Sequence, residues 1–269
     1  MNKRIKIIFA ILIVMTIIFA YGALLYHNPM RPSGISLEPP GKEHILGTDD
    51  LGIDVFAQVS KGYFSSMTIG ILSAAVTFII GGVAGVAAGY YGGRIDLVIS
   101  FLINLFLSVP QLPIMIVIGA FFGQSMFNIV MVVALFSWAS VARVVRSRVI
   151  GLCNYGYVKM ASYYGADFWY LFKHHLKADI VPLLMINAVF VIGRAIVQES
   201  SLAFIGLSDP LSKSWGMMIN AATNFRGIYY TDYWKWWLMP PVICLTGTIL
   251  LICFLSRELE NLMVDGKRR

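Results

Sequence analysis

Residues 157–182 read YVKMASYYGADFWYLFKHHLKADIVP, a polar, basic and aromatic stretch in a chain that is otherwise mostly apolar. Gly165 is expected to end one short helix, because glycine readily takes the left-handed conformation common at helix ends. Asp167 is expected to begin a second helix, because its side chain accepts hydrogen bonds from free backbone N–H groups. The stretch therefore predicts two short helices joined at a turn and presented to a soluble partner. We call residues 157–182 the elbow.

The composition around the elbow is that of an integral membrane protein. Of the 269 residues, 58% are hydrophobic and 13% are charged, whereas soluble domains carry about 25% charged residues. Apolar runs long enough to cross a bilayer lie at residues 5–26, 67–90, 97–121, 127–149, 180–202 and 238–255. We predict an all-α fold of six transmembrane helices in one membrane domain. Residues 1–62 are expected to hold the first span and an extracellular segment, and residues 63–269 the remainder.

The basic residues predict the orientation of these spans. Of the 21 lysines and arginines, 14 lie on the side of the two chain ends and the elbow. Six lie on the other side, at Arg31, Lys42, Lys61, Lys213, Arg226 and Lys235. Because basic residues favour cytoplasmic loops, both termini and the elbow are expected in the cytoplasm. The segments 27–62 and 208–237 are then extracellular, and the Tyr and Trp residues at 229–237 suit an interfacial aromatic belt. Cations gathered at span ends give no nucleic-acid surface.

Neither the cysteines nor the histidines form a recognisable ligand motif. Cys153, Cys244 and Cys253 are scattered and odd in number, so we expect small apolar side chains rather than a disulfide framework. His174 and His175 are adjacent and point about 100° apart on a helix. The remaining pair on the extracellular side, His27 and His44, is distant in sequence. We therefore expect no metal site.

Three acidic residues stand close together before the second span. Asp49, Asp50 and Asp54 suggest a calcium loop, but the twelfth position counted from Asp50 is Lys61, where an EF-hand needs a bidentate Glu. We favour a capped turn, in which Thr48 or Asp49 starts a short helix. The same segment is a candidate contact for an extracellular binding protein.

The ionisable residues nearest to a span interior are Arg194 and Glu199. A charge at the centre of a membrane helix costs about 2.5–3.5 kcal/mol on insertion scales, so these side chains are expected to face other helices or water. They lie about 140° apart on a helix and are poor partners for each other. Gln198 lies one turn from Arg194. Lining or gating of a pathway and interhelical structure are both open for Glu199.

Two prolines and a row of glycines mark special places in the spans. Pro110 and Pro113 break the third span, either at a substrate site or hinge, as in transporters with broken helices, or at a packing kink. Gly81, Gly85 and Gly89 form small-xxx-small pairs that let helices approach closely. We favour packing of these glycines within the bundle over a surface for a second membrane subunit.

Several segments resemble one family over nearly the whole chain. They are residues 44–56 (HILGTDDLGIDVF), 89–96 (GYYGGRID), 199–207 (ESSLAFIGL) and 214–218 (SWGMM). They resemble the H-x-LGTD-x-LG-x-DV, AGYYGG-x-x-D, E-x-SL-x-FLGL and SWG-x-M segments of dipeptide, oligopeptide and nickel ABC importer permeases, in the order that this family has them. The elbow resembles the family's EAA loop through Ala161 and Gly165. The type is the shorter, "C" permease of such systems.

The elbow also departs from the family pattern. Lys159 replaces the acidic residue of the EAA loop, and Lys177 and Ala178 stand where the family usually has Pro-Asn. The first change reverses a charge at the implied ATPase contact, which implies a partner with an altered groove or a weaker dependence on that Glu.

The resemblance implies a type I ABC importer permease fold with a cytoplasmic coupling helix in a loop at 153–180. It implies that the chain forms half of a pathway in a bacterial plasma membrane, beside a second homologous permease. One or two ATPase subunits carrying ATP and magnesium, and an extracellular solute-binding lipoprotein, complete the system. The implied ATPase contacts are Lys159, Ala161, Tyr163, Tyr164, Gly165, Ala166, Asp167, Phe168 and Trp169. The solute is expected to be a peptide, nickel or a metal chelate.

The chain itself is not expected to be an enzyme. It has no G-x-x-x-x-G-K-[ST] phosphate loop, so ATP hydrolysis falls to a partner. The alternatives are a scaffold that recruits a cytoplasmic partner and an enzyme embedded in the membrane. The second alternative would need catalytic groups within the bilayer, and the sequence offers no intramembrane His, paired aspartates or G-x-S-x-G elbow.

Overall fold

The computed structural model describes residues 3–122, 125–207 and 213–266. The described residues form helices joined by loops, with one isolated β-bridge between Thr48 and Asp54. The elements are α1 (Lys3–Tyr21), η1 (Gly22–Tyr26), α2 (Val55–Tyr91), α3 (Gly93–Ser108), α4 (Gln111–Phe122), α5 (Met126–Cys153), α6 (Gly156–Tyr163), α7 (Phe168–Leu171), η2 (Phe172–Leu176), α8 (Lys177–Phe204), α9 (Trp215–Asn224), η3 (Asp232–Lys235) and α10 (Met239–Gly266).

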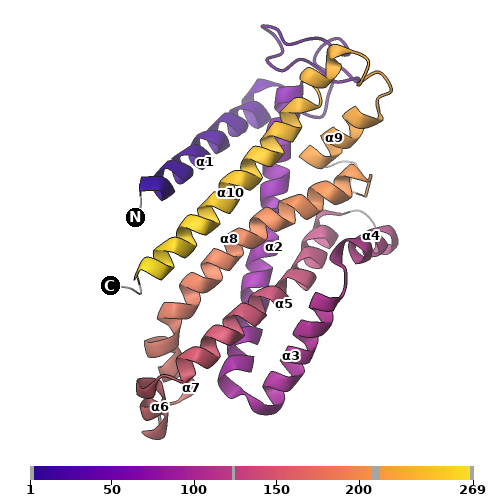
Figure 1. The fold of residues 1–269 in the computed structure, drawn as a ribbon. Coiled ribbons are helices and arrows are strands. Elements are labelled where there is room, and N and C mark those ends of the chain that lie inside the picture. The colour runs from indigo at the N-terminus through magenta and orange to yellow at the C-terminus, as the bar shows by residue number, and fades with distance from the viewer. Residues whose placement is uncertain (1–2, 123–124, 208–212, 267–269) are drawn as a thin grey trace.

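The long helices run side by side, with distinct structures at the two ends of the bundle (Figure 1). One end carries α6, α7 and the turn between α2 and α3, and we call it the elbow end. The opposite end carries the loop of residues 27–54 and the segment between α9 and α10, and we call it the loop end. The first turn of α1 and the last turn of α10 both point away from the loop end, as the prediction of both chain ends on one side requires.

The predicted spans correspond to the long apolar helices. In the part of the chain that the structure describes, five helical stretches are long and apolar enough to cross a membrane: Lys3–Tyr26, Val55–Tyr91, Met126–Cys153, Phe168–Phe204 and Asp232–Met263. The remaining predicted span is a bent pair, α3 and α4, whose axes differ by 85°. The break lies at Pro110, where the sequence predicted it. The all-helical membrane fold is confirmed, with five candidate spans among the described residues, or six if the bent pair α3–α4 is one span.

Helix α2 begins at Val55, well before the span predicted from residue 67. Asp54 caps it by accepting a hydrogen bond from the backbone N–H of Ala57, at 2.8 Å. The prediction that Thr48 or Asp49 starts a short helix is therefore wrong. The polar first turns of α2 hid the helix from a hydropathy pattern, although Gln58 is buried. The domain boundary expected after residue 62 falls inside α2, and that division stays a prediction.

The second helix of the elbow is continuous with the fifth span. Helix α7, the π-turn η2 and α8 follow one another without a break from Phe168 to Phe204, and Pro182 lies inside α8. The span predicted from residue 180 therefore begins earlier, because the helix that starts in the elbow at Phe168 continues into it. The extracellular segment predicted at 208–237 contains the unpredicted helix α9; residues 208–212 and the cations at 267–269 lie outside the described residues.

The glycines of α2 pack against α5. A Cβ placed on Gly81 would meet the carbonyl oxygen of Trp138 at 3.0 Å, and one on Gly85 would meet the carbonyl oxygen of Ala142 at 2.8 Å. One on Gly89 would meet Val149 Cβ at 2.7 Å. The preferred interpretation, packing within the bundle, is confirmed for these glycines.

The aromatic residues at the loop end divide into two groups. Tyr229 and Tyr230 are exposed, as an interfacial belt requires. Trp237 is buried, and it packs in one cluster with Trp215 and Phe225. The belt prediction is wrong for Trp237, because its ring belongs to the core that holds α9 and α10 against α2.

Candidate functional site

The turn of the elbow has the hydrogen bonds of a Schellman helix end. The backbone N–H of Ala166 donates to the carbonyl of Ala161 at 3.1 Å, and that of Gly165 donates to Ser162 at 3.0 Å. Gly165 has φ +86°, the left-handed conformation that glycine takes without a steric cost. Asp167 then caps α7 by accepting from the N–H of Tyr170, at 3.0 Å. The predicted helix stop at Gly165 and helix start at Asp167 are both confirmed.

This turn exposes a group of aromatic rings at the end of the bundle. Tyr163 and Tyr164 are each 85% exposed and Trp169 is 71% exposed. Lys159, on α6, is also exposed. A hollow of about 320 Å³ opens beside the rings, lined by Ala161, Tyr164, Gly165, Ala166 and Tyr170. Exposed aromatic rings beside a hollow are typical of a protein–protein contact, because buried aromatic anchors carry much of the binding energy.

Phe168, predicted as part of the same contact, points into the bundle instead. Its ring centroid lies 4.8 Å from that of Tyr90 and 5.8 Å from that of Tyr91. Phe168 therefore ties the elbow to the end of α2, and its role in a partner contact stays a prediction.

Buried side chains and an ion pair attach the elbow to the long helices. Val158 of α6 and Leu171 of α7 are buried. At the start of α8, Asp179 accepts from the guanidinium of Arg148 on α5, at 2.6 Å. A displacement of the elbow would therefore move α5 and α8 with it, since packed helices shift as bodies rather than deform.

Glu199, one of the predicted pathway residues, is fully buried where α8 meets α2 and α9. Its Oε2 accepts from the hydroxyl of Ser66 on α2 at 3.2 Å and from Ser200 at 3.4 Å. The hydroxyl of Ser214, which caps α9, lies beside the same carboxylate. Ser66 and Ser214 were not predicted as partners, because nothing in the sequence separates them from other serines near span ends.

Gln198 and Arg194 bind two further elements. Gln198 exchanges amide hydrogen bonds with Gln111, at 2.7 and 3.3 Å. Gln111 follows Pro110 directly and begins α4, so the pair joins the break in the third span to α8. The guanidinium of Arg194 lies 5.1 Å from the Phe190 ring centroid and 3.5 Å from Ser140 Oγ on α5.

Arg194, Gln198 and Glu199 thus connect α8 to α5, α4 and α2 rather than to one another. Pro113 lies in the first turn of α4. Lining of a pathway by these three residues and by Pro110 and Pro113 stays a prediction.

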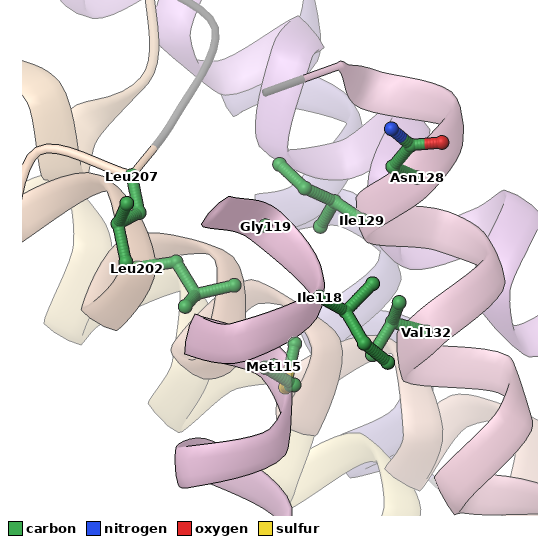
Figure 2. Close-up of a pocket in the computed structure, with 8 residues that line it drawn as sticks. All are labelled: Met115, Ile118, Gly119, Asn128, Ile129, Val132, Leu202 and Leu207. Carbon is green, nitrogen blue, oxygen red and sulfur yellow. The ribbon is translucent and has the colours of Figure 1, made fainter. Parts of the chain in front are cut away.

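A small apolar hollow lies between α4, α5 and the end of α8, and Figure 2 shows Ile118 and Met115 of α4 between Val132 and Leu202. Its volume is about 10 Å³, which is roughly the room that one water molecule needs. This hollow is too small to hold a peptide-sized solute.

At the loop end, the structure brings together two histidines that are far apart in sequence. The ring centroids of His27 and His44 lie 5.1 Å apart, so these residues are close in space although they are far apart in the sequence. His44 Nδ1 lies 2.8 Å from Asp54 Oδ2, and both side chains are buried. A sequence pattern could not place His27 here, because the turn of η1 and the path of the following loop decide its position.

Comparisons with known proteins agree on one family. A family model described as "binding-protein-dependent transport system inner membrane component" matches residues 78–266. The chain is 32% identical over 233 residues to a probable D,D-dipeptide transport system permease of Escherichia coli, covering 86% of this chain and 74% of that protein. It is 34% identical over 232 residues to a glutathione transport system permease of Pectobacterium atrosepticum, with coverages of 86% and 73%.

A dipeptide transport system permease of Bacillus subtilis is 30% identical over 233 residues, covering 86% of this chain and 71% of that protein. Among solved structures, an inward-facing methionine ABC transporter, MetNI, has a chain that matches with a TM-score of 0.57 at 14% identity, covering 77% of this chain and 95% of that one. At that identity the match concerns the fold alone.

Proposed function

The chain belongs to the binding-protein-dependent transport system inner membrane components, the permease subunits of ABC importers, and on this premise we propose that it forms half of the pathway of an ATP-driven peptide importer. Permease subunits of this family are multi-pass inner-membrane proteins without catalytic residues of their own. The proposal adds the solute, the coupling contact and the partners.

One observation carries the proposed coupling role, namely the outward-facing aromatic group on the elbow. Tyr163, Tyr164 and Trp169 are exposed beside a hollow, on two short helices whose inner faces are packed against α2, α5 and α8. This arrangement suits insertion into a cleft of a soluble ATPase subunit, with Ala161, Gly165 and Ala166 small enough for close approach at the turn. Lys159 places a cation at that contact, so we expect the groove that receives it to be acidic or neutral.

The remaining partners follow from the same proposal. A second, homologous permease would supply the other half of the pathway, and one or two ATPase subunits would bind ATP and magnesium. An extracellular binding lipoprotein would deliver the solute at the loop end. The elbow end and both termini would then face the cytoplasm, which the excess of basic residues at these places supports.

We propose a peptide as the solute, because the relatives named above act on dipeptides or glutathione. Nickel or a metal chelate is the alternative for this family. A panel of dipeptides, tripeptides and Ni²⁺ complexes, offered to the loaded system, distinguishes these solutes by uptake.

In this proposal, the polar contacts of α8 hold α2, α4 and α5 in fixed positions beside the pathway. ATPase closure would move the elbow, and α8 would carry the motion to Glu199 and Gln198 near its far end. The Gln198–Gln111 pair lies next to the break at Pro110, so we expect the bent pair α3–α4 to shift with α8.

The test is reconstitution in proteoliposomes with the neighbouring permease, ATPase and binding-protein subunits. The variant is Tyr164→Ala, which removes an exposed ring that lines the hollow. We expect stimulation of ATPase activity by loaded binding protein, and loss of most of that stimulation in the variant. Loss of an anchoring ring at an interface costs about 2 kcal/mol or more, or roughly 30-fold in affinity.

The matched control is Tyr230→Ala, since Tyr230 is 90% exposed at the loop end. It should leave assembly with the ATPase unchanged. If Tyr164→Ala binds the ATPase and transports as the unaltered chain does, the elbow aromatics are not the coupling contact. If the unaltered complex assembles but no solute stimulates it, the scaffold alternative is favoured.

A further inference from the structure

A hollow of about 540 Å³ lies between the first and last spans, outside the elbow and the loop end. Its walls are the start of α1 and the end of α10, two helices that pack against each other and whose ends point the same way in Figure 1. On α1 the hollow is lined by Arg4, Ile7 and Ile8, whose spacing of three and four places them on one face of the helix. This face is basic near the chain end and apolar further into the span.

The facing side of α10 has the same order of basic and apolar residues. Four residues with i, i+3, i+4 and i+7 spacing, one stripe of a helix, line the hollow: Phe254, Arg257, Glu258 and Asn261. Phe254 is exposed and lies about 4.5 Å deeper along the helix axis than Arg257. The hollow therefore has an apolar inner part and a charged outer part, which is the order of acyl chain and headgroup in one leaflet of a membrane.

The charges at the hollow favour an anion. Arg4 Nη1 donates to Glu258 Oε1 at 3.3 Å, so this pair spans the gap between the two helices. The Arg4 side chain is 77% exposed, and a guanidinium has five N–H donors, of which this contact uses one. Arg257 is exposed and forms no ion pair among the described residues. The lining thus holds two cations and one carboxylate, and Lys3 and Lys6 are exposed in the same turns of α1.

A purely structural role explains the ion pair but not the second arginine. Arg4 and Glu258 by themselves would fasten α1 to α10. Arg257 adds a guanidinium that this contact does not need, at the edge of an open hollow. Guanidinium groups bind phosphate through two parallel hydrogen bonds, and basic pockets between transmembrane helices bind phosphorylated lipid headgroups. A partner helix is the alternative occupant, but close packing of membrane helices favours small residues rather than two arginines.

We propose that this hollow binds one anionic phospholipid. Its phosphate would lie between Arg4 and Arg257, at the outer end of the hollow. One acyl chain would run along the exposed side chains of Ile7 and Phe254.

A lipid in this hollow would hold the first span against the rest of the bundle. The buried residues of α1 are Ile5 and Phe19, so few side chains attach this helix to the others. A molecule bound to α1 and α10 together adds contacts between them. Because it would bind the folded chain and not the unfolded one, it would also raise stability by mass action. The site does not depend on the proposed solute or on the ATPase contact.

The test is native mass spectrometry of the full chain in detergent, titrated with phosphatidylglycerol and, separately, with phosphatidylcholine that carries the same acyl chains. We expect one tightly bound phosphatidylglycerol per chain and weaker binding of phosphatidylcholine. Arg257→Gln should weaken phosphatidylglycerol binding roughly tenfold or more, because a hydrogen bond between two charged groups is lost. The preference for phosphatidylglycerol should shrink in the same variant.

The matched control is Arg94→Gln, which removes one exposed cation at the elbow end and should leave phosphatidylglycerol binding unchanged. Equal losses in the two variants would mean that the arginines attract anionic lipid only through the net charge of the protein, and would overturn the proposal. An unchanged affinity in Arg257→Gln would overturn it as well.

Two further measurements separate the lipid from other occupants. Excess glycerol phosphate should not displace the bound phosphatidylglycerol; displacement would mean that the hollow binds a soluble phosphate and not a lipid. The lipid should also stay bound when the chain assembles with its second permease. Its loss on assembly would assign the hollow to a contact between subunits, and the lipid proposal would fail.

Discussion

The glycines of α2 and the glycine of the elbow serve opposite purposes. Along α2, Gly85 is needed because α5 lies too close for any side chain, since a Cβ there would meet Val145 Cβ at 2.7 Å. At the elbow, Gly165 faces open space, because no heavy atom of the described residues lies within 4 Å of the position that a Cβ would take, but its φ is +86°. The first position is set by a neighbouring helix, and the second by the backbone itself.

This difference separates the closely packed part of the molecule from the part that we propose meets a partner. At the α2–α5 contact, the backbones of the two helices lie so close together that an added methyl group on α2 would press on the backbone of α5. The elbow is closed only toward the bundle, where Val158 and Leu171 are buried, and is open outward, where Tyr163 and Tyr164 are exposed. Substituting alanine for glycine in α2 and at the elbow allows the two regions to be compared through the same kind of change.

The largest loss of stability is expected for Gly85→Ala. The new methyl group would press on the carbonyl oxygen of Ala142 at 2.8 Å as well as on Val145, and overpacking of this kind costs about 1–3 kcal/mol. The measurement is the free energy of unfolding of the chain in detergent. An unchanged value would mean that α2 and α5 can separate at little cost, and the contrast with the elbow would fail.

A smaller loss is expected for Gly165→Ala. Nothing in the described residues would touch the methyl group, but a left-handed backbone costs a residue with a Cβ about 1–2 kcal/mol. The loss should appear as faster amide hydrogen exchange confined to the Schellman turn, together with weaker binding of the ATPase. Gly156→Ala, in the first turn of α6 and also without a nearby atom among the described residues, is the control and should change neither quantity.

The sequence predicted the two helix ends of the elbow correctly because their signals are local. Gly165 takes the left-handed conformation that ends α6, and Asp167 caps α7 through the N–H of Tyr170, three residues later. Neither feature depends on a distant part of the chain. The break at Pro110 was predicted for the same reason. By contrast, the meeting of His27 with His44 and the partners of Glu199 depend on how loops and helices cross, which neither hydropathy nor spacing records.

The start of α2 shows a second limit of sequence patterns. Residues 55–66 carry polar side chains, so a hydropathy threshold begins the span near residue 67. Yet Gln58 is buried, with its amide donating to Asp49 at 2.6 Å. Burial of a polar group that is hydrogen-bonded costs little, and only the structure shows that the partner is present.

Gly82→Ala should have an effect close to zero, although Gly82 lies next to Gly81 on the same helix. Its new methyl group would meet only the end of the Leu184 side chain, with Cδ1 at 3.1 Å. A flexible leucine can move by a few tenths of an ångström, and alanine favours the helix over glycine by about 0.5–1 kcal/mol. A destabilisation as large as that of Gly85→Ala would show that α8 is held as rigidly against α2 as α5 is.

The only substitution in this series expected to be stabilising is Gly151→Ala. Gly151 is exposed in the last turn of α5, and no described heavy atom lies within 4 Å of the new methyl group. Its backbone is helical, so alanine should raise the free energy of unfolding by up to about 1 kcal/mol. The comparison is made in the isolated chain and again in the assembled transporter. A gain in the first and a loss in the second would mean that a partner subunit approaches α5 at this glycine, and the open region would then extend from the elbow along α5.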